Sequence, residues 1–420
     1  FGHWQSKLNY RYLEADAWLD VFPDSDAYGG KTNSKGAEFV LNYGLTKKMI
    51  LGFDLYLKLE NLQRTGSFKT RGSMYAISKL DQNQRKSGVV TASAGNHAQG
   101  VAFAARELGI YSLVVMPEYT PNTKLDAVKE LGSEVELYGS TFDDAYARAK
   151  EYESSKGLVM IHPFDDFDVV AGQGTVALEI LEQVPDVDTI IVSVGGGGLI
   201  SGVISVVKTL KPDTRVIGVV ADGVPSLKES MKTGHSVEVS SISTIADGIA
   251  VKKIGDNCFP IIQEHSDQIV SVSDDSMASA ILRLLEEERM LAEAAGAAPL
   301  ASLFDRKLKS TGKTVALICG GNLDVNLLSR IIGKGLALNN RYAKLQVPLH
   351  DVPGALTRLS QIVSEERVNI IHIEHDRFST QVPINHTLSR LYLEVRGNDH
   401  LEFLVKRLIS ENYEVIRENN

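Results

Sequence analysis

Short apolar runs alternate with segments of helical periodicity from residue 51 to about residue 340. A strand-type run such as Leu55–Leu59 is followed by a segment such as Ser73–Leu80, in which apolar positions have helical spacing. Further strands are expected at Gly88–Ala92, Tyr111–Met116, Val135–Tyr138, Leu158–Ile161, Thr189–Val194, Arg215–Val220 and Thr314–Ile318. Further helices are expected at His97–Leu108, Thr123–Leu131, Thr141–Ser154 and from about Leu199.

This alternation predicts an α/β core of open, mostly parallel, twisted sheets with flanking helices. Because so many strands rarely share one sheet, we expect two lobes, with a small lobe of about residues 73–165 inserted into a large one. Residues 1–50 are the least informative part of the core. The stretch Pro23–Ser34, which contains two adjacent glycines, predicts turns with helical pieces around it.

The composition shifts near Asn339–Tyr342. Beyond this point the pattern predicts strand, helix, strand, strand, helix and strand, which is the βαββαβ order of a ferredoxin-like unit. The six elements are expected at Ala343–Leu349, Pro353–Glu366, Asn369–Phe378, Thr387–Val395, Asp399–Ser410 and Tyr413–Arg417. We therefore divide the chain into a core of residues 1–338, a linker of residues 339–342 and a separate module of residues 343–420.

Composition and charge narrow the classes of function. With 420 residues and 43% hydrophobic content, the chain can form two or three domains with sizeable cores. A net charge of −9 without a long basic tract argues against nucleic acid or an acidic membrane as partner. The two cysteines, Cys258 and Cys319, lie far apart in the sequence, which indicates no disulfide framework and a reducing, cytoplasmic location.

Two segments bear on targeting. The N-terminal residues lack the apolar core of a signal peptide. The segment Thr189–Val207 is uncharged and long enough to span a membrane, but four consecutive glycines, Gly195–Gly198, interrupt it. A buried strand, a glycine loop and a helix fit this segment better, so we expect a soluble protein.

The candidate chemistry begins at Lys69, within Ser67–Gly72, between a predicted strand and a predicted helix. Folds of the α/β class place functional groups at such turns. A lone lysine is usually solvated. A desolvated lysine, however, loses affinity for its proton and becomes an amine able to form a Schiff base.

Three glycine-bearing turns favour the functional interpretation of Lys69. Ser93–Gly100 follows a strand and opens a helix, so its N–H groups can receive a carboxylate. Gly195–Gly198 has the same context and can wrap a phosphate with several N–H donors. Cys319–Asn322 places a side-chain donor at the C-terminal edge of a sheet. Each turn alone indicates only a tight turn, but together with Lys69 they predict a site for an aldehyde cofactor that carries a phosphate.

These motifs resemble those of the threonine dehydratases, or threonine ammonia-lyases, which are tryptophan-synthase-β-like, fold-type II pyridoxal-phosphate enzymes. The resemblance covers about residues 53–338. Five motifs in the family's order carry it: Ser67–Gly72, Ser93–His97, Ala171–Thr175, Gly195–Leu199 and Cys319–Asn322. The tail, with Asp351–Leu356 and Asn369–Ile371, resembles an ACT domain, which is an amino-acid-sensing module.

The resemblance implies a role for each matching residue. Lys69 would hold pyridoxal 5'-phosphate covalently and then act as base on the substrate Cα–H. Phe68 would lie against the cofactor face, although it would also be an ordinary core phenylalanine. Asn96 would donate a hydrogen bond to the phenolic oxygen of the cofactor. The phosphate would be bound by Gly195, Gly196, Gly197, Gly198 and Leu199, and the substrate carboxylate would be framed by Ser93, Ala94, Gly95 and His97.

Four further positions refine this interpretation. Glu293 resembles the family's acidic residue near the cofactor ring. Cys319 stands where the family more often has serine as donor to the pyridine nitrogen, and a weakly donating thiol suits β-elimination better than transamination or decarboxylation. Ala94 stands where serine racemases carry a serine, which disfavours racemisation. Val220 stands where cation-binding relatives have glutamate, so we expect no metal.

The expected function is β-elimination of water from L-threonine, and also from L-serine, to give 2-oxobutyrate or pyruvate and ammonia, as a first step of isoleucine biosynthesis. The rivals are hydroxyaspartate dehydration or serine racemisation on the same scaffold, and a non-catalytic amino-acid sensor. The ACT resemblance implies a homodimer or homotetramer. It also implies an amino-acid effector, isoleucine or valine, at Asp351, Gly354 and Asn369.

Overall fold

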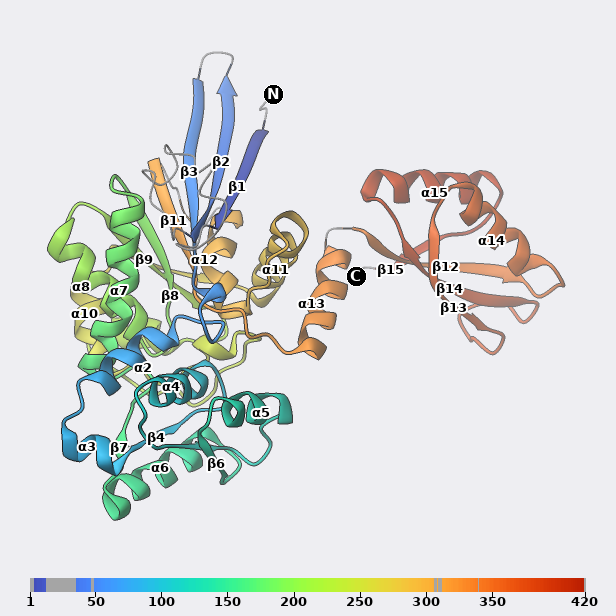
Figure 1. The fold of residues 1–420 in the computed structure, drawn as a ribbon. Coiled ribbons are helices and arrows are strands. Elements are labelled where there is room, and N and C mark those ends of the chain that lie inside the picture. The colour runs from blue at the N-terminus through green and yellow to red at the C-terminus, as the bar shows by residue number, and fades with distance from the viewer. Residues whose placement is uncertain are drawn as a thin grey trace. The chain divides into compact units, whose positions relative to one another are not determined.

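The computed structural model describes residues 4–12, 35–46, 49–305, 308, 312–338 and 340–418, with side chains from residue 54 onward. The chain divides into two compact units, Phe1–Leu323 and Asp324–Asn420 (Figure 1). The predicted turns at Pro23–Ser34 lie outside the described residues.

The first unit contains two sheets that share no strand. In the large sheet, neighbouring strands from β3 to β10 are parallel, while β1 and β2 are added antiparallel at one edge. The strands in spatial order are β1 (Trp4–Tyr12), β2 (Lys35–Thr46), β3 (Met49–Leu59), β11 (Gly312–Ile318), β8 (Thr189–Ser193), β9 (Arg215–Ala221) and β10 (Gln268–Val272). The prediction of mostly parallel sheets is confirmed.

The antiparallel edge corrects the prediction for residues 1–50. Helical pieces were expected there, but residues 4–12 and 35–46 form strands. The apolar residues Phe39, Leu41 and Tyr43 recur with the two-residue period of a strand, and Phe39 pairs with Leu55 of β3.

The small sheet has four parallel strands in the order β6, β5, β4 and β7. Its strands are β4 (Val89–Ala92), β5 (Ser112–Met116), β6 (Glu134–Leu137) and β7 (Val159–Met160), and the helices of this part of the chain are α3 (Gln82–Ser87), α4 (Asn96–Glu107), α5 (Asn122–Glu130) and α6 (Phe142–Lys156). Strands β4 and β5 are buried along their whole length, which explains why their sequences are continuous apolar runs. The two-lobed core is thus confirmed as two separate sheets.

Helices bring the two sheets together around α2, which contacts both α4 and α7 (Figure 1). The helices of the large lobe are α2 (Lys69–Ser78), α7 (Phe167–Gln183), α8 (Gly198–Leu210), α9 (Ser226–Thr233), α10 (Cys258–His265), α11 (Asp274–Glu288) and α12 (Ala294–Phe304), with short 3-10 turns η1 (Glu60–Leu62) and η2 (Asp247–Ile249). No helix among the described residues has the length and apolar composition needed to cross a membrane.

Glycines set the distances between α2, α7 and α8. A Cβ atom on Gly172 would lie 2.6 Å from the Cα of Gly72, and one on Gly202 would lie 2.4 Å from the carbonyl oxygen of Val170. Real Cβ atoms do not approach other atoms so closely, so both helix pairs depend on glycine. The motif Ala171–Thr175 is therefore a helix-packing motif.

The second unit is a four-stranded antiparallel sheet with the order β13, β14, β12 and β15 and with flanking helices. Its elements are α13 (Val325–Leu338), β12 (Tyr342–His350), α14 (Ala355–Glu365), β13 (Asn369–Asp376), β14 (His386–Glu394), α15 (Asn398–Ser410) and β15 (Ile416–Glu418). From β12 onward the order is βαββαβ, as predicted. Leu345, Val347, Leu391 and Leu404 lie in its apolar core.

Candidate active site

The turn that carries Lys69 is tied to the end of β11. The N–H of Phe68 donates to the carbonyl oxygen of Cys319 at 3.0 Å, and Ser67 forms a β-bridge with Gly320. Helix α2 then begins at Lys69 itself, earlier than the predicted start at Ser73. Two of the motifs found in the sequence, which are about 250 residues apart, therefore lie side by side.

The amine of Lys69 is turned into the interior of the unit. Its Nζ donates to the carbonyl oxygen of Pro163 at 2.6 Å and lies 5.3 Å from the centroid of the Phe68 ring. Burial lowers the pKa of this amine from 10.5 to about 8, although the nearby Cys319 and Glu293 act in the opposite direction. A large fraction is thus neutral near pH 8, as a nucleophile or a base requires.

The segment Pro163–Phe164, which contacts the amine of Lys69, also packs against the glycine loop Gly195–Gly198. A Cβ on Gly196 would lie 2.3 Å from the ring of Phe164, and one on Gly198 would lie 2.7 Å from the carbonyl oxygen of Phe164. Gly197 has a φ of +102° and caps the N-terminus of α8. Glycine is the residue that adopts this backbone without strain, and the positive end of the α8 dipole favours an anion here.

A chain of amides and a carboxyl group joins three motifs. The Nδ2 of Asn96 donates to both carboxylate oxygens of Glu293, at 2.8 and 3.0 Å. The Oδ1 of Asn96 accepts from the Nδ2 of Asn322 at 2.8 Å, and the same Nδ2 donates to the carbonyl oxygen of Thr65 at 2.7 Å. These bonds fix the orientation of the Asn96 amide beside the turn that leads to Lys69.

Burial also changes the acidities of the neighbouring groups. It raises the pKa of Glu293 to about 7, against the effect of the Asn96 hydrogen bonds. It raises the pKa of the Cys258 thiol to about 12, and that of the Cys319 thiol even further. Both thiols therefore keep their protons at neutral pH, while Glu293 changes charge in that range. Perturbed acids and bases gathered in this way are typical of active sites.

The predicted contacts to a substrate carboxylate lie in the turn between β4 and α4. The Oγ of Ser93 accepts from the N–H of Gly95 at 3.2 Å, and a Cβ placed on Gly95 would meet no atom of the described residues within 4 Å other than its chain neighbours. The Nε2 of the buried His97 contacts the carbonyl oxygen of Ile161 at 2.9 Å, and burial lowers the pKa of this imidazole to about 3. A role of His97 at the carboxylate would therefore fall to its backbone N–H, and Ala94 likewise offers only its backbone.

This arrangement fits pyridoxal phosphate. Lys69 would supply the amine for the aldehyde, and the glycine loop before Leu199 presents backbone at the N-terminus of α8, where an anion is favoured. The neutral thiol of Cys319 suits an unprotonated pyridine nitrogen. The Asn96 amide nitrogen donates to Glu293, so donation to the phenolic oxygen would replace one of these two bonds. Among the described residues, no three His, Cys, Asp or Glu side chains are grouped as metal ligands would be.

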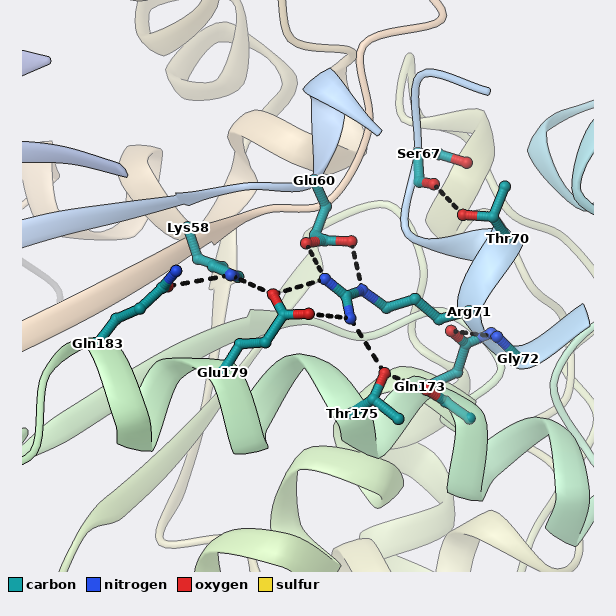
Figure 2. Close-up of polar contacts among 11 residues, drawn as sticks. Lys58, Glu60, Ser67, Thr70, Arg71, Gly72, Gln173, Thr175, Glu179 and Gln183 are labelled. Carbon is teal, nitrogen blue, oxygen red and sulfur yellow. Dashed lines mark hydrogen bonds and ion pairs between the residues drawn. The ribbon is translucent and has the colours of Figure 1, made fainter. Parts of the chain in front are cut away.

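Two features close to Lys69 were not predicted from the sequence. One is the segment Pro163–Phe164, for which the sequence carries no evident signal. The other is a cluster of four charged side chains, shown in Figure 2, which consists of Lys58, Glu60, Arg71 and Glu179. The sequence feature that could have indicated this cluster is Lys58, a lysine inside the apolar run Leu55–Leu59. A charge in a buried strand requires a partner of opposite charge.

The three predicted effector residues are exposed in the second unit. Asp351 and Gly354 lie in the loop between β12 and α14, and Asn369 is the first residue of β13. The carboxylate of Asp351 accepts from Nη2 of Arg377 at 2.8 Å, and Nδ2 of Asn369 donates to Glu394 at 3.1 Å. The positions match the prediction, while their role stays a prediction.

Comparison with known proteins agrees with these features. A family model described as pyridoxal-phosphate dependent enzyme matches residues 45–320, and a model described as putative porin matches residues 1–64. The L-threonine ammonia-lyase of Geobacter sulfurreducens is 46% identical over 364 residues, which cover 86% of this chain and 90% of the relative.

Solved structures give a similar result for about two thirds of the chain. The processed threonine deaminase isoform 2 of Solanum lycopersicum has a TM-score of 0.65 and 41% identity, covering 67% of this chain and 78% of the other. Maize serine racemase has a TM-score of 0.64 and 35% identity, covering 68% and 88%. The shared backbone therefore does not by itself separate elimination from racemisation.

Proposed function

Because the chain belongs to the pyridoxal-phosphate-dependent enzymes and, within them, to the threonine ammonia-lyase family, we propose that it converts L-threonine to 2-oxobutyrate and ammonia. L-Serine is proposed as a second substrate, giving pyruvate. The observation that carries the proposal is the desolvated amine of Lys69, which contacts the same short segment, Pro163–Phe164, as the glycine loop Gly195–Gly198.

The residues of this chain would divide the work as follows. Pyridoxal phosphate, when bound, supplies the electron sink for the electrons left at the substrate Cα. Lys69 in its neutral form takes the Cα proton, and its pKa near 8 makes that form available close to neutral pH. Cys319 would be the donor to the pyridine nitrogen, and because burial keeps its thiol neutral it would leave that nitrogen unprotonated. The weaker electron sink would favour loss of the β-hydroxyl group over transamination or decarboxylation.

Glu293 and Asn96 would act as a pair. The carboxyl group holds the Asn96 amide, and its pKa of about 7 allows it to hold or release a proton near the cofactor ring at neutral pH. The turn at Ser93, Ala94 and Gly95 would bind the substrate carboxylate through N–H groups at the start of α4.

Ala94 separates this proposal from serine racemisation. A racemase needs an acid or base on each face of the substrate carbon. The methyl group of Ala94 can neither donate nor accept a proton. The backbone of maize serine racemase is about as similar to this chain as that of the tomato threonine deaminase, with TM-scores of 0.64 and 0.65. The side chain of Ala94 is therefore the observation that favours elimination.

We further propose that the second unit senses isoleucine or valine at Asp351, Gly354 and Asn369, and that the protein acts in isoleucine biosynthesis as a homodimer or homotetramer. The module order and the exposed positions of these residues support this proposal. It implies a difference in affinity of the effector for two states of the protein.

The test is spectroscopic and chemical. The purified protein should take up pyridoxal phosphate, show the absorbance of the bound cofactor, and form 2-oxobutyrate from L-threonine. A Lys69→Ala variant should lose both the absorbance and the product. Consumption of hydroxyaspartate without turnover of threonine, or absorbance without any turnover, would refute the substrate assignment or the enzymatic assignment respectively.

A further inference from the structure

Every N–H group of the Arg71 guanidinium has an acceptor (Figure 2). Its Nε and Nη2 donate to Glu60 at 2.7 and 2.8 Å, and its Nη1 and Nη2 donate to Glu179 at 2.7 and 2.8 Å. The fifth N–H donates from Nη1 to the Oγ1 of Thr175 at 3.1 Å. An arginine side chain has five such donors, so this planar group has one orientation in the cluster.

The cluster is balanced and mostly buried. Lys58 adds a second cation, which donates to Glu179 at 2.5 Å and to Gln183 at 3.0 Å. The side chains of Glu60, Lys58 and Arg71 are 2%, 6% and 10% exposed, while Glu179 is 41% exposed. Removing one partner would leave a buried charge unpaired, which is costly, so the group behaves as a unit.

Arg71 joins the first turn of α2 to two other elements. Glu60 follows the last residue of β3, and Glu179 and Thr175 belong to α7. The adjacent Gly72 has its N–H bonded to the Oε1 of Gln173 at 3.2 Å, in the same close crossing of α2 and α7. On the other side, a Cβ on Gly100 of α4 would lie 3.0 Å from the backbone of Lys69.

Among the described residues, no hydrogen bond joins Arg71 to the amine of Lys69. The charge of Arg71 is also not a cause of the shift in the pKa of Lys69. Its effect on the chemistry must therefore act through the backbone of the helix that both residues share. Catalysis depends on placing reacting groups to within a fraction of an ångström. We infer that Arg71 is a positioning residue, which fixes the first turn of α2 between β3 and α7 and thereby places the amine of Lys69 in its dry site.

The inference rests on the proposed role of Lys69, and its test uses Arg71→Lys. Lysine keeps the charge but replaces the five-donor fork with a compact ammonium group. We expect the apparent Kd for pyridoxal phosphate to rise about tenfold and kcat for threonine to fall at least about tenfold, with KM little changed. We also expect the pH midpoint for acylation of Lys69, read by mass spectrometry of its peptide, to move from about 8 toward the ordinary lysine value because water enters.

Arg148→Lys is the matched control. Arg148 also has several carboxylate partners, Glu136 at 3.0 Å and Glu151 at 2.7 Å, but it lies in α6 and is 31% exposed. The Arg148→Lys variant should leave the cofactor affinity, kcat and the pH midpoint for acylation of Lys69 unchanged. If Arg71→Lys does not fold, Glu179→Gln, in the half-exposed member of the cluster, should move the same three quantities in the same direction by less.

The outcomes are distinct. A folded Arg71→Lys protein with the Lys69 midpoint and cofactor affinity of the wild type overturns the inference, even if its melting temperature falls, because Arg71 would then be structural only. A wild-type protein that takes up no cofactor or leaves threonine unchanged refutes the proposed function instead. The acylation midpoint of Lys69 needs neither cofactor nor substrate, so it still decides the role of Arg71 in that case.

Discussion

Lys69 is surrounded by groups that would raise its pKa and by a dry environment that lowers it, and the dry environment is the stronger influence. This balance is a property of one residue in its folded surroundings. A lysine in an ordinary turn, hydrated on all sides, would be almost fully protonated at the pH where this enzyme family is expected to work. The burial of Lys69 therefore matters more for its reactivity than the charges near it.

The first prediction concerns the pH dependence of this amine. Acylation of Lys69 in the cofactor-free protein should rise about tenfold per pH unit up to about pH 8 and then level off, because the neutral amine is the reactive form. The same peptide in urea should continue to rise until about pH 10.5, the ordinary value. The measurement is competitive labelling followed by mass spectrometry. Coincident curves in water and in urea would contradict the burial of Lys69.

The second prediction concerns Glu293. Its pKa is about 7 in the folded protein and near 4.5 when unfolded, so the folded chain binds more protons between these values and its stability falls as the pH rises through this window. Glu293→Gln cannot lose a proton there. Relative to wild type, the variant should therefore gain stability between pH 5 and pH 8.5, on the order of 2 kcal/mol.

The readout for Glu293→Gln is the difference in melting temperature between variant and wild type at the two pH values. A constant loss at both values is expected from the weaker hydrogen bonding to Asn96, and only the change with pH tests the prediction. A difference that stays constant from pH 5 to pH 8.5 would show that Glu293 titrates normally.

At the scale of single residues, the sequence predicted candidate site residues where a local motif carries the chemistry. Lys69 and the glycine loop were recognisable because a turn that needs glycine or a functional lysine is encoded within a few neighbouring positions. The partners of Arg71 were not recognisable, because Glu60 and Glu179 meet only when β3, α2 and α7 pack in one register.

At the scale of elements, the strands that are buried on both faces were the easiest to predict. The strand β8 is buried throughout, and the apolar residues Ile190–Val192 at its centre marked it correctly. Helix α7 was missed although it has 17 residues, because Gly172 and Gly174 argue against a helix when read locally. The structure shows that these glycines allow close packing between helices. The residues they pack against, in α2 and α8, are distant in the sequence, so the local pattern does not reveal this role.

The third prediction tests this packing. Gly172→Ala should place a Cβ 2.6 Å from Gly72 and 2.7 Å from the carbonyl oxygen of Arg71, and backbone atoms cannot yield as a flexible side chain can. We expect a loss of stability of about 1–3 kcal/mol. We also expect a lower kcat, since α2 carries Lys69. Chemical denaturation and steady-state kinetics are the measurements.

Gly333→Ala is the control for Gly172→Ala. Gly333 also lies inside a helix, α13, but outside that helix the part of the chain that the structure describes places no atom within 4 Å of a Cβ at this position. Alanine is favoured over glycine in a helix by roughly 0.5–1 kcal/mol, so this change should be neutral or stabilising. If the two substitutions changed stability equally, the close approach of α2 and α7 would not be the cause of the stability loss in Gly172→Ala.

At the scale of the whole molecule, the sequence predicted both kinds of sheet that are present, the mostly parallel sheets and the antiparallel βαββαβ sheet. The compact units are Phe1–Leu323 and Asp324–Asn420, whereas the prediction placed the boundary at a linker of residues 339–342. In the first unit, helical crossovers join neighbouring parallel strands, such as β8 and β9. In the second unit, strands joined through a helix are not neighbours, because β14 lies between β12 and β13 and β12 lies between β14 and β15, and every neighbouring pair is antiparallel. The N-terminal strands β1 and β2 were not predicted, since their pairing depends on β3 rather than on their own composition.

The last prediction concerns communication within the whole molecule. If an amino acid binds at the loop between β12 and α14, isothermal titration with isoleucine or valine should give heat, and the same ligand should change the kinetics with threonine. Asp351→Ala should abolish both effects while leaving basal turnover unchanged, because this residue lies outside the unit that contains Lys69. Glu402→Ala removes another carboxylate of the same unit, paired with Arg417 at 2.6 Å, and should preserve both effects. A ligand that binds but changes neither the affinity for threonine nor its turnover has equal affinity for all states of the protein, and the second unit would then not be regulatory.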